Sequence, residues 1–313
     1  MVSDRYSVII DGIKISLDAA ELPADVFLTE DLTPLKPLKN LEKLFLPWRR
    51  ISDLTPLAEL KKLTILELSQ NHIADITPLK GLTNLQKLIL NQNQISDLSP
   101  LENLTRLKEL MLSDNEITDI TPLADLKSMT FLDLKNNRIV DLYPLQGLTK
   151  TMWLRLSNAQ IADISPIAGM KQLRDLYLDG CKIQDFTPLR DLTRLRWLDL
   201  SNTDISDLTP VKGLYSLNTL YLNGNRITDL SPLADLTKLG ELFLAHNTIT
   251  DLSPFSELNW LQRLNLEDNP LEDLSLLNGM PMLREVYIKN CPIKRQSLEA
   301  FRKANPDCRI EIN

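Results

Sequence analysis

The chain of 313 residues is 43% hydrophobic, which is enough for a folded core, and it carries a formal net charge of −7. This acidic balance argues against a general nucleic-acid-binding protein, because phosphate backbones attract an excess of lysine and arginine. No stretch without charges approaches the length of a membrane-spanning helix, so we expect no insertion into a membrane.

Residues 1–40 precede the regular part of the sequence and are expected to form an N-terminal cap. The segment 8–15 reads Val-Ile-Ile-Asp-Gly-Ile-Lys-Ile and predicts a β-hairpin with its turn at Asp11-Gly12, since Asp-Gly is a favoured two-residue hairpin turn. The segment 31–35, Asp-Leu-Thr-Pro-Leu, is the second half of a degenerate repeat. Together these segments would cover the core that the first coil of a repeat protein leaves exposed.

Residues 41–292 consist of a 22-residue repeat without insertions or deletions. Its first positions fall at Leu41, Leu63, Leu85, Leu107, Met129, Thr151, Leu173, Leu195, Leu217, Leu239, Leu261 and Leu283. A fixed period of roughly 20 to 29 residues with the pattern L-x-x-L-x-L-x-x-N-x-I is the signature of leucine-rich repeats. The unbroken period predicts one elongated domain of twelve copies, although the length alone would suggest two domains.

Each copy combines two hydrophobic periods. In the copy that begins at Leu85, Leu88 and Leu90 alternate around Ile89, which is the periodicity of a strand. Apolar residues then recur every third position, at Ile95, Leu98, Leu101 and Leu104. This second spacing suits a 3-10 or short α turn. The pattern predicts a right-handed solenoid of the α/β class, with a parallel β-sheet on the concave side and short 3-10 or α turns on the convex side.

The ninth position of the repeat is asparagine in seven copies, at Asn71, Asn93, Asn115, Asn137, Asn225, Asn247 and Asn269. A buried side-chain amide there would bond the backbone groups left free where the strand turns. Arg49 and Cys291 hold this position in the outer copies, and Ala159, Cys181 and Thr203 interrupt the run. Cysteine and threonine are expected to serve in part, whereas Ala159 predicts a looser turn or a bound water.

The thirteenth position is aspartate in eleven copies, at Asp53, Asp75, Asp97, Asp119, Asp141, Asp163, Asp185, Asp207, Asp229, Asp251 and Asp273. In the first of them Thr55 is placed to N-cap a short helix, and Pro56 stands at the first helical position. The aspartate just upstream is suited to accept hydrogen bonds from turn amides. We therefore favour a structural role for the aspartates over the alternative, a row of cation sites.

Residues 293–313 break the repeat and predict a C-terminal cap. Ser297–Ala304 forms an amphipathic helical pattern that ends at Asn305-Pro306, and residues 309–312 predict a last strand. The chain has three cysteines, Cys181, Cys291 and Cys308. This odd, sparse count is not a disulfide framework, so we expect reduced, buried thiols. Pairing of Cys291 with Cys308 in an exported protein is the alternative.

The copies at residues 82–101 and 214–233 resemble the repeats of bacterial internalins and, less closely, the 22-residue repeats of phosphatase-regulating proteins. The resemblance covers about residues 30–292, and the ending Asn305-Pro-Asp-Cys308 is similar to the terminal cap of many bacterial leucine-rich-repeat proteins. It implies the repeat fold and a protein-binding role. No apolar leader segment follows the first methionine, so the sequence as it stands predicts a cytoplasmic protein. A secreted or surface location is the alternative if a leader was removed.

The third and fifth positions of each copy face solvent from the predicted concave sheet. Large aromatic residues gather there in the middle and C-terminal copies, at Phe131, Trp153, Tyr177, Trp197, Tyr221 and Phe243. Exposed aromatics with charged neighbours such as Arg155 and Asp199 have the composition of a binding hot spot. The alternative is that the rings pack on one another and only cover the sheet. A weaker apolar track comprises Phe45, Trp48, Ile65, Ile89 and Met111.

Patterns typical of an enzyme are missing from the sequence. The two histidines, His72 and His246, lie in copies eight apart, which is roughly 38 Å at about 4.8 Å per strand. The sequence contains no Gly-rich phosphate loop, no H-E-x-x-H and no C-x-x-C. The carboxylates of Asp175, Asp179 and Asp199 are expected to form a polar rim rather than a cation site.

We therefore expect a non-catalytic, monomeric scaffold that binds a protein partner on its concave face, with no cofactor, metal or nucleic acid. The alternatives are a secreted or surface internalin-like adhesin, an intracellular regulatory subunit of an enzyme and, last, a ligand- or cation-binding receptor.

Overall fold

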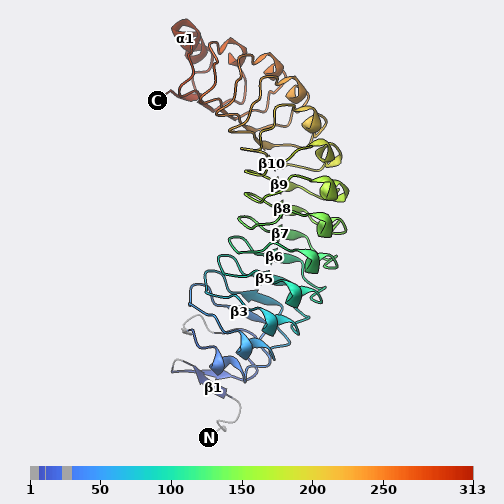
Figure 1. Ribbon diagram of the computed structural model, residues 1–313. Coiled ribbons are helices and arrows are strands. Elements are labelled where there is room, and N and C mark those ends of the chain that lie inside the picture. Colours follow the sequence, from blue (N-terminus) through green and yellow to red (C-terminus); the bar gives the residue numbers. More distant parts are fainter. Residues whose placement is uncertain (1–6, 11, 23–29, 313) are drawn as a thin grey trace. The chain divides into compact units, whose positions relative to one another are not determined.

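The computed structural model describes residues 7–10, 12–22 and 30–312, and the chain divides into two compact units, residues 1–155 and 156–313. Each unit is a stack of similar coils (Figure 1), and each coil contributes one short strand and one short helical turn. The predicted repeat fold is confirmed within each unit.

In the first unit, the strands of successive coils pair in parallel and in chain order. They are β3 (Lys43–Phe45), β4 (Ile65–Glu67), β5 (Lys87–Ile89), β6 (Glu109–Met111), β7 (Phe131–Asp133) and β8 (Trp153–Arg155). Residues 22 positions apart are direct partners, as Leu88 is of Leu110. The period of the sequence is therefore also the register of the sheet.

The second unit repeats this arrangement. Its strands are β9 (Asp175–Tyr177), β10 (Trp197–Asp199), β11 (Thr219–Tyr221), β12 (Glu241–Phe243), β13 (Arg263–Asn265), β14 (Glu285–Tyr287) and β15 (Arg309–Glu311). The last strand belongs to the C-terminal cap and pairs with β14, so the cap continues the sheet by one strand.

The other side of the coils carries 3-10 turns. They are η2 (Thr33–Leu35), η3 (Thr55–Leu57), η4 (Thr77–Leu79), η5 (Ser99–Leu101), η6 (Thr121–Leu123), η7 (Tyr143–Leu145), η8 (Ser165–Gly169), η9 (Thr187–Asp191), η10 (Thr209–Val211), η11 (Ser231–Leu233), η12 (Ser253–Phe255) and η13 (Ser275–Leu277). All but η13 have proline at their start, where a missing N–H leaves no bond unmade.

The three-residue leucine period follows from the hydrogen bonding of these turns. The N–H groups of Leu57 and Leu60 donate to the carbonyls of Leu54 and Leu57 at 2.9 Å, and the N–H of Leu63 donates to Leu60 at 3.0 Å. A chain of such i to i+3 bonds brings every third side chain to the same face. All four leucines are buried, so the turn geometry itself directs them into the core.

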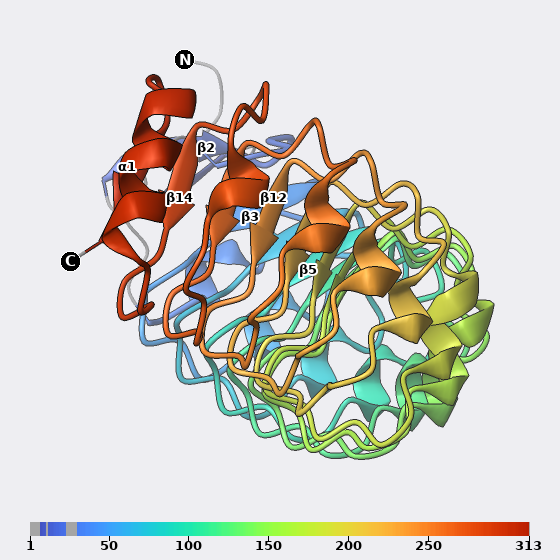
Figure 2. The same ribbon diagram turned by 90° about the horizontal axis from the view of Figure 1, so that it is seen from above.

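The strands and the helix predicted for the two ends of the chain form in the described residues. β1 (Ser7–Ile10) and β2 (Ile13–Ser16) form the predicted antiparallel hairpin. Gly12 has a left-handed φ of 77°, whereas Asp11 of the predicted turn lies outside the described residues. At the other end, α1 (Arg295–Ala304) begins two residues earlier than predicted and lies against the turn η13 of the last coil (Figure 2). Its Phe301 is fully buried and closes the core there.

The asparagines at the ninth position of the repeat, here called the asparagine ladder, form the predicted hydrogen bonds to the backbone. Asn115 donates from its amide to the carbonyls of Leu90 and Leu112, both at 3.0 Å, and its Oδ1 accepts the N–H of Ile95 at 3.0 Å. One buried side chain thus joins its own turn to the preceding coil. The same bonds recur at other asparagines of the ladder, for example at Asn247, whereas Asn225 Oδ1 accepts the N–H of Thr203.

Where the asparagine is missing, other donors take the free carbonyl. The N–H of Ala159 donates to Leu156 at 3.2 Å, so the predicted looser turn is wrong at this copy: the backbone closes it directly. Cys181 also donates its thiol to Leu156, at 3.3 Å, and Thr203 donates its hydroxyl to Leu200 at 2.7 Å. Cysteine and threonine therefore serve in part, as expected.

The aspartates of the thirteenth position shape the start of each 3-10 turn. Asp53 Oδ1 accepts the N–H of Thr55 at 2.8 Å, and its Oδ2 accepts the threonine hydroxyl at 2.9 Å. The predicted N-cap by the threonine hydroxyl is wrong, because that hydroxyl is a donor to the aspartate and makes no bond to the turn backbone. The predicted role of the aspartate as an acceptor of turn amides is confirmed.

The eighth position of every copy adopts a left-handed backbone. Its φ lies between 53° and 74° in residues Trp48, Gln70, Gln92, Asp114, Asn136, Asn158, Gly180, Asn202, Gly224, His246, Asp268 and Asn290. Glycine, asparagine and aspartate accept this conformation readily, whereas a bulky residue is strained in it. Trp48 is therefore the outlier of the series, and its side chain is 70% exposed.

Candidate binding surface

The solvent-facing side of each sheet carries the first and third residues of every strand, here called the strand face. The middle residue of each strand is buried in the core, as Leu132 is in β7 and Leu198 in β10. Most residues of the strand face are half-buried by their neighbours on adjacent strands. All eight residues of the predicted binding site lie on this face, three in the first unit and five in the second.

In the first unit, Phe131 and Trp153 stack with their ring centroids 3.9 Å apart and an angle of 5° between the planes. The register of β7 and β8 places Asp133 beside Arg155 on the same face. Asp133 is only 7% exposed and accepts the N–H of Lys135 at 3.0 Å. Burial raises the pKa of Asp133, while this hydrogen bond and the charge of Arg155 act in the opposite direction.

In the second unit, four aromatic rings form a continuous row, here called the aromatic row: Tyr177, Trp197, Tyr221 and Phe243. Successive ring centroids are 6.0, 5.2 and 4.2 Å apart, and the last pair is stacked at 5°. The rings pack on one another, as the alternative interpretation expected, and each still reaches solvent. Asp199 lies in register between the two tyrosines, so five of the predicted residues meet here.

Carboxylates surround the aromatic row. Asp175 is the strand partner of Trp197, and burial raises its pKa against the charges of Arg174 and Arg196. Burial, and then the charges of Glu241 and Asp199, raise the pKa of Tyr221. The phenol of this tyrosine therefore experiences a negative environment.

Beyond the row, the strand face is held by an ion-pair network. Arg263 lies between two carboxylates, with Nε at 2.8 Å from Glu285 and Nη1 at 3.3 Å from Glu241. The hydroxyl of Tyr287 donates to Glu285 at 3.0 Å. These bonds raise the pKa of Arg263 and lower that of Glu285.

The weaker apolar track also lies on the first unit. Phe45 is 55% exposed, more than any ring of the aromatic row, and Trp48 follows it in the left-handed position. Ile65, Ile89 and Met111 are half-buried and add little open surface. The sequence pattern therefore located this track but underestimated the exposure of its two aromatic residues.

Neither histidine belongs to the predicted binding site. His72 lies in the first unit and His246 in the second, where its Nδ1 is 3.3 Å from Asp268. Within the described ranges, no group of three histidine, cysteine, aspartate or glutamate residues is placed to hold a metal ion. In the same ranges, no helix has the length and apolar character needed to cross a membrane.

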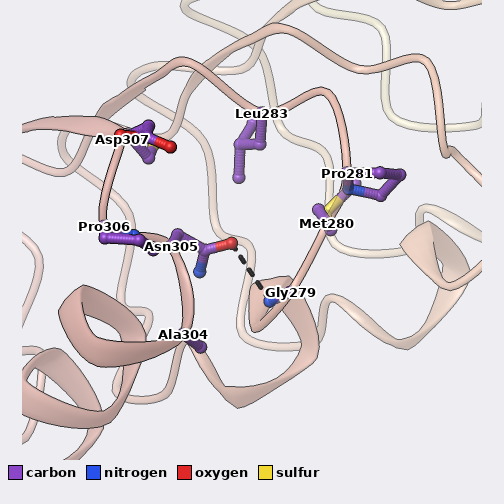
Figure 3. A pocket seen from close by; sticks show the side chains of 9 residues that line it. Gly279, Met280, Pro281, Leu283, Ala304, Asn305, Pro306 and Asp307 are labelled. Carbon is purple, nitrogen blue, oxygen red and sulfur yellow. Dashed lines mark hydrogen bonds between the residues drawn. The ribbon is translucent and has the colours of Figure 1, made fainter.

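A cavity of about 220 Å³ lies where the C-terminal cap meets the last coil (Figure 3). Asn305 fills its wall: its Oδ1 accepts the N–H of Gly279 at 3.0 Å, and its amide donates to the carbonyls of Leu277 and Phe301. Asn305 thus joins the C-terminal cap to the preceding coil through side-chain to backbone hydrogen bonds, as the ladder asparagines join the repeats. Cys308 also lines this cavity, and burial raises its pKa to about 11, so the thiol is a poor nucleophile.

All three cysteines are free thiols. Cys181 is buried, as predicted, and desolvation raises its pKa to about 12. Cys291 and Cys308 are half-buried, so the prediction of buried thiols is wrong for these two. Neither forms the alternative disulfide.

Comparison with known proteins places this geometry in a family. The sequence matches the family described as "Leucine Rich repeats (2 copies)" over residues 61–103, 83–124, 105–147, 193–235, 215–259 and 237–279, more than half of the chain. No match to a curated protein was found.

Several solved structures are similar. An internalin from Listeria monocytogenes has a TM-score of 0.84 and 33% identity, covering 89% of this chain and 84% of that one. A leucine-rich-repeat protein from Leptospira interrogans has a TM-score of 0.84 and 27% identity, covering 94% and 75%. The ectodomain of a plant membrane receptor kinase from Arabidopsis thaliana, solved in complex with CASPARIAN STRIP INTEGRITY FACTOR 2, has a TM-score of 0.77, covering 94% and 37%. At 22% identity, this last similarity shows the fold alone.

Proposed function

Because the chain belongs to the leucine-rich-repeat proteins and its repeats are internalin-like, we propose that it is a non-catalytic scaffold that binds a protein partner on its strand face. The observation that carries this proposal is the aromatic row. Leucine side chains fill most of the core. The aromatic rings on the solvent-facing side of the sheet are therefore not needed to pack the core. Contiguous aromatic surface beside charged groups is typical of binding hot spots.

The rigidity of the surface supports the same function. The row stands on parallel strands of fixed register, and Asn225 and Asn247 donate to the carbonyls of Leu200 and Leu222 in the preceding coils. A preformed surface loses little conformational entropy when it binds. In the first unit, the stacked pair of Phe131 and Trp153 with Arg155 forms a second anchor of the same composition.

Such a scaffold could serve as a secreted or surface adhesin or as an intracellular regulatory subunit of an enzyme. The similarity to a Listeria internalin favours the adhesin. The experiment below therefore samples partners from both sides of the cell envelope.

The test is affinity capture with three forms of the protein, with quantification of retained proteins by mass spectrometry. The wild type is compared with Trp197→Ala/Tyr221→Ser on the row. The matched control is Trp260→Ala/Tyr215→Ser, which removes the same residue types from exposed positions that lie off the strand face. Baits are presented to a cell lysate and, separately, to surface and secreted fractions.

We expect a protein that the wild type and the control retain and the row variant loses. Retention that is equal for all three forms, or lost only with the control, would overturn the proposal. Circular dichroism and thermal unfolding of each variant establish that both remain folded.

A further inference from the structure

The strand faces of the two units differ in charge. On the second unit, the first and third strand residues and the residue two further on include seven carboxylates: Asp175, Asp179, Asp199, Glu241, Glu267, Glu285 and Glu311. The bases at these positions are Arg263, Lys289 and Arg309. The same positions of the first unit hold four bases, Lys43, Lys87, Lys135 and Arg155, and three carboxylates, Glu67, Glu109 and Asp133. Only the second unit therefore presents a strongly acidic strand face.

The bases of the second unit offset only part of this negative charge. Arg263 pairs with both Glu241 and Glu285, so one positive charge faces two negative ones. Arg309 pairs with Glu311, and Lys289 follows β14, two strands beyond β12, where the row ends. Arg174 and Arg196 flank the row from the positions before β9 and β10, where both are exposed. They border the acidic face rather than fill it.

Rings and carboxylates together define the chemistry of an occupant. A lysine ammonium or an arginine guanidinium is attracted to the face of a tryptophan or tyrosine ring within about 6 Å of its centroid. The carboxylates of Asp175 and Asp199 stand in register beside Trp197 and the tyrosines, so the same cation also meets a full negative charge. An acidic occupant would meet only repulsion there.

The dimensions suit a segment of polypeptide. The row crosses the four strands β9 to β12, that is three spacings of about 4.8 Å or roughly 14 Å. An extended chain advances about 3.4 Å per residue, so about four residues lie along the row.

We propose that the second-unit strand face binds a basic segment of a protein partner, whose lysine or arginine side chains lie over the aromatic row among Asp175, Asp199 and Glu241. This inference rests on the proposed function and names the chemistry of the partner. The aromatic row supplies the contact area, and the carboxylates select the sign of charge.

The test uses a displayed library of random-sequence peptides, selected on the immobilised full-length protein. Binding of the enriched peptides is then measured to three variants. The first is Trp197→Ala/Tyr221→Ser. The second, Asp175→Asn/Asp199→Asn/Glu241→Gln, removes the charges of the row but keeps the shapes of the side chains. Asp199 Oδ1 accepts the N–H of Ser201 at 2.9 Å, and an asparagine retains that acceptor.

The third variant, Asp191→Asn/Asp235→Asn/Glu257→Gln, is the control for charge. It neutralises three exposed carboxylates of the same unit that lie within or just after the 3-10 turns, away from the strand face. Its net charge equals that of the second variant. A difference between the two therefore reports position and not overall charge.

We expect enriched peptides to be rich in lysine or arginine, to lose roughly tenfold or more in affinity for the first two variants, and to bind the control as tightly as the wild type. Peptides that depend on the rings but are not basic, or that tolerate the neutral row, overturn this inference and leave the proposed function standing. Equal weakening by the second variant and the control overturns it as well. Peptides that ignore the ring variant, or a library without binders, overturn both.

Discussion

At the scale of the single residue, the ladder asparagines carry more of the stability than their number suggests. Asn115→Ala leaves the N–H of Ile95 and the carbonyls of Leu90 and Leu112 without their side-chain partner in a buried site. An unsatisfied buried polar group costs about 1–3 kcal/mol. We expect a loss of roughly 2–4 kcal/mol in the free energy of unfolding, measured by urea denaturation.

Asn91→Ala is the matched control for this substitution. Asn91 is half-buried, and its Oδ1 accepts a single N–H, that of Ser113, at 2.9 Å. The loss here should be about 1 kcal/mol. Equal losses for the two variants would show that the ladder has no special weight.

Some single-residue features could be predicted from the sequence and others could not. The asparagine ladder was predictable because the same side chain returns at a fixed interval. The left-handed eighth position was not, because glutamine, histidine and a tryptophan stand there beside asparagine and glycine. The threonine before each turn proline was assigned the wrong partner, because sequence cannot tell whether a hydroxyl donates or accepts. Asp53 and Thr55 show that it donates.

At the scale of the element, the 3-10 turn η13 lacks the proline that begins the other described turns. Leu276 holds that place and is 47% exposed, so the core does not need its side chain. Proline at a compatible position restricts the unfolded chain and stabilises by about 0.4–1 kcal/mol. Leu276→Pro should therefore raise the midpoint of thermal unfolding, as measured by calorimetry.

The contrasting substitution is Asn278→Pro in the same segment. The N–H of Asn278 donates to the carbonyl of Ser275 at 3.2 Å, and proline removes that donor. This variant should be destabilised, although the φ of −64° suits proline. If both variants gain stability, the turn hydrogen bond is dispensable.

At the scale of the whole molecule, the repeated aspartates couple stability to pH. Eight of them have a pKa lowered by the hydrogen bonds they accept, from the turns in seven cases and first from Ser297 of α1 in the case of Asp273: Asp31, Asp53, Asp75, Asp119, Asp185, Asp207, Asp251 and Asp273. A pKa lowered by folding contributes stability above its ordinary value of 3.8, and that stability is lost as the pH falls through the lowered value. Asp133 and Asp175 act in the opposite direction, because burial raises their pKa and the folded state holds their protons more tightly.

Eight aspartates with a lowered pKa thus stand against two with a raised one. We expect the melting temperature to stay level down to about pH 5 and to fall steeply below about pH 4. The variant Asp53→Asn/Asp75→Asn/Asp119→Asn keeps an Oδ1 acceptor at three turns but cannot titrate there, so its acid decline should be shallower. An identical decline in both proteins would assign acid unfolding to other groups.

The geometry of the proposed binding surface could be predicted from the sequence in part. A period of 22 residues places the same position of every copy on one face, which is why Trp197 and Tyr221 meet in the structure as the sequence indicated. The asymmetry of charge between the two strand faces depends on which individual positions carry aspartate or glutamate, and it emerged only when each unit was assembled. Rings at one face indicate binding, whereas their charged neighbours indicate what is bound.

The sequence period and the strand register are both 22 residues. This equality determines what deletion or duplication of a gene segment does to the protein. Loss of the codons for Lys87 to Lys108 would remove one whole coil and leave Glu109 directly after Gln86. β6 would then take the place of β5 beside β4, with the same register, the same leucine spacing and an unbroken asparagine ladder. Unequal recombination in steps of twenty-two codons would thus lengthen, shorten or reshuffle the strand face and keep the register of the sheet, so this surface can change by whole strands at a time.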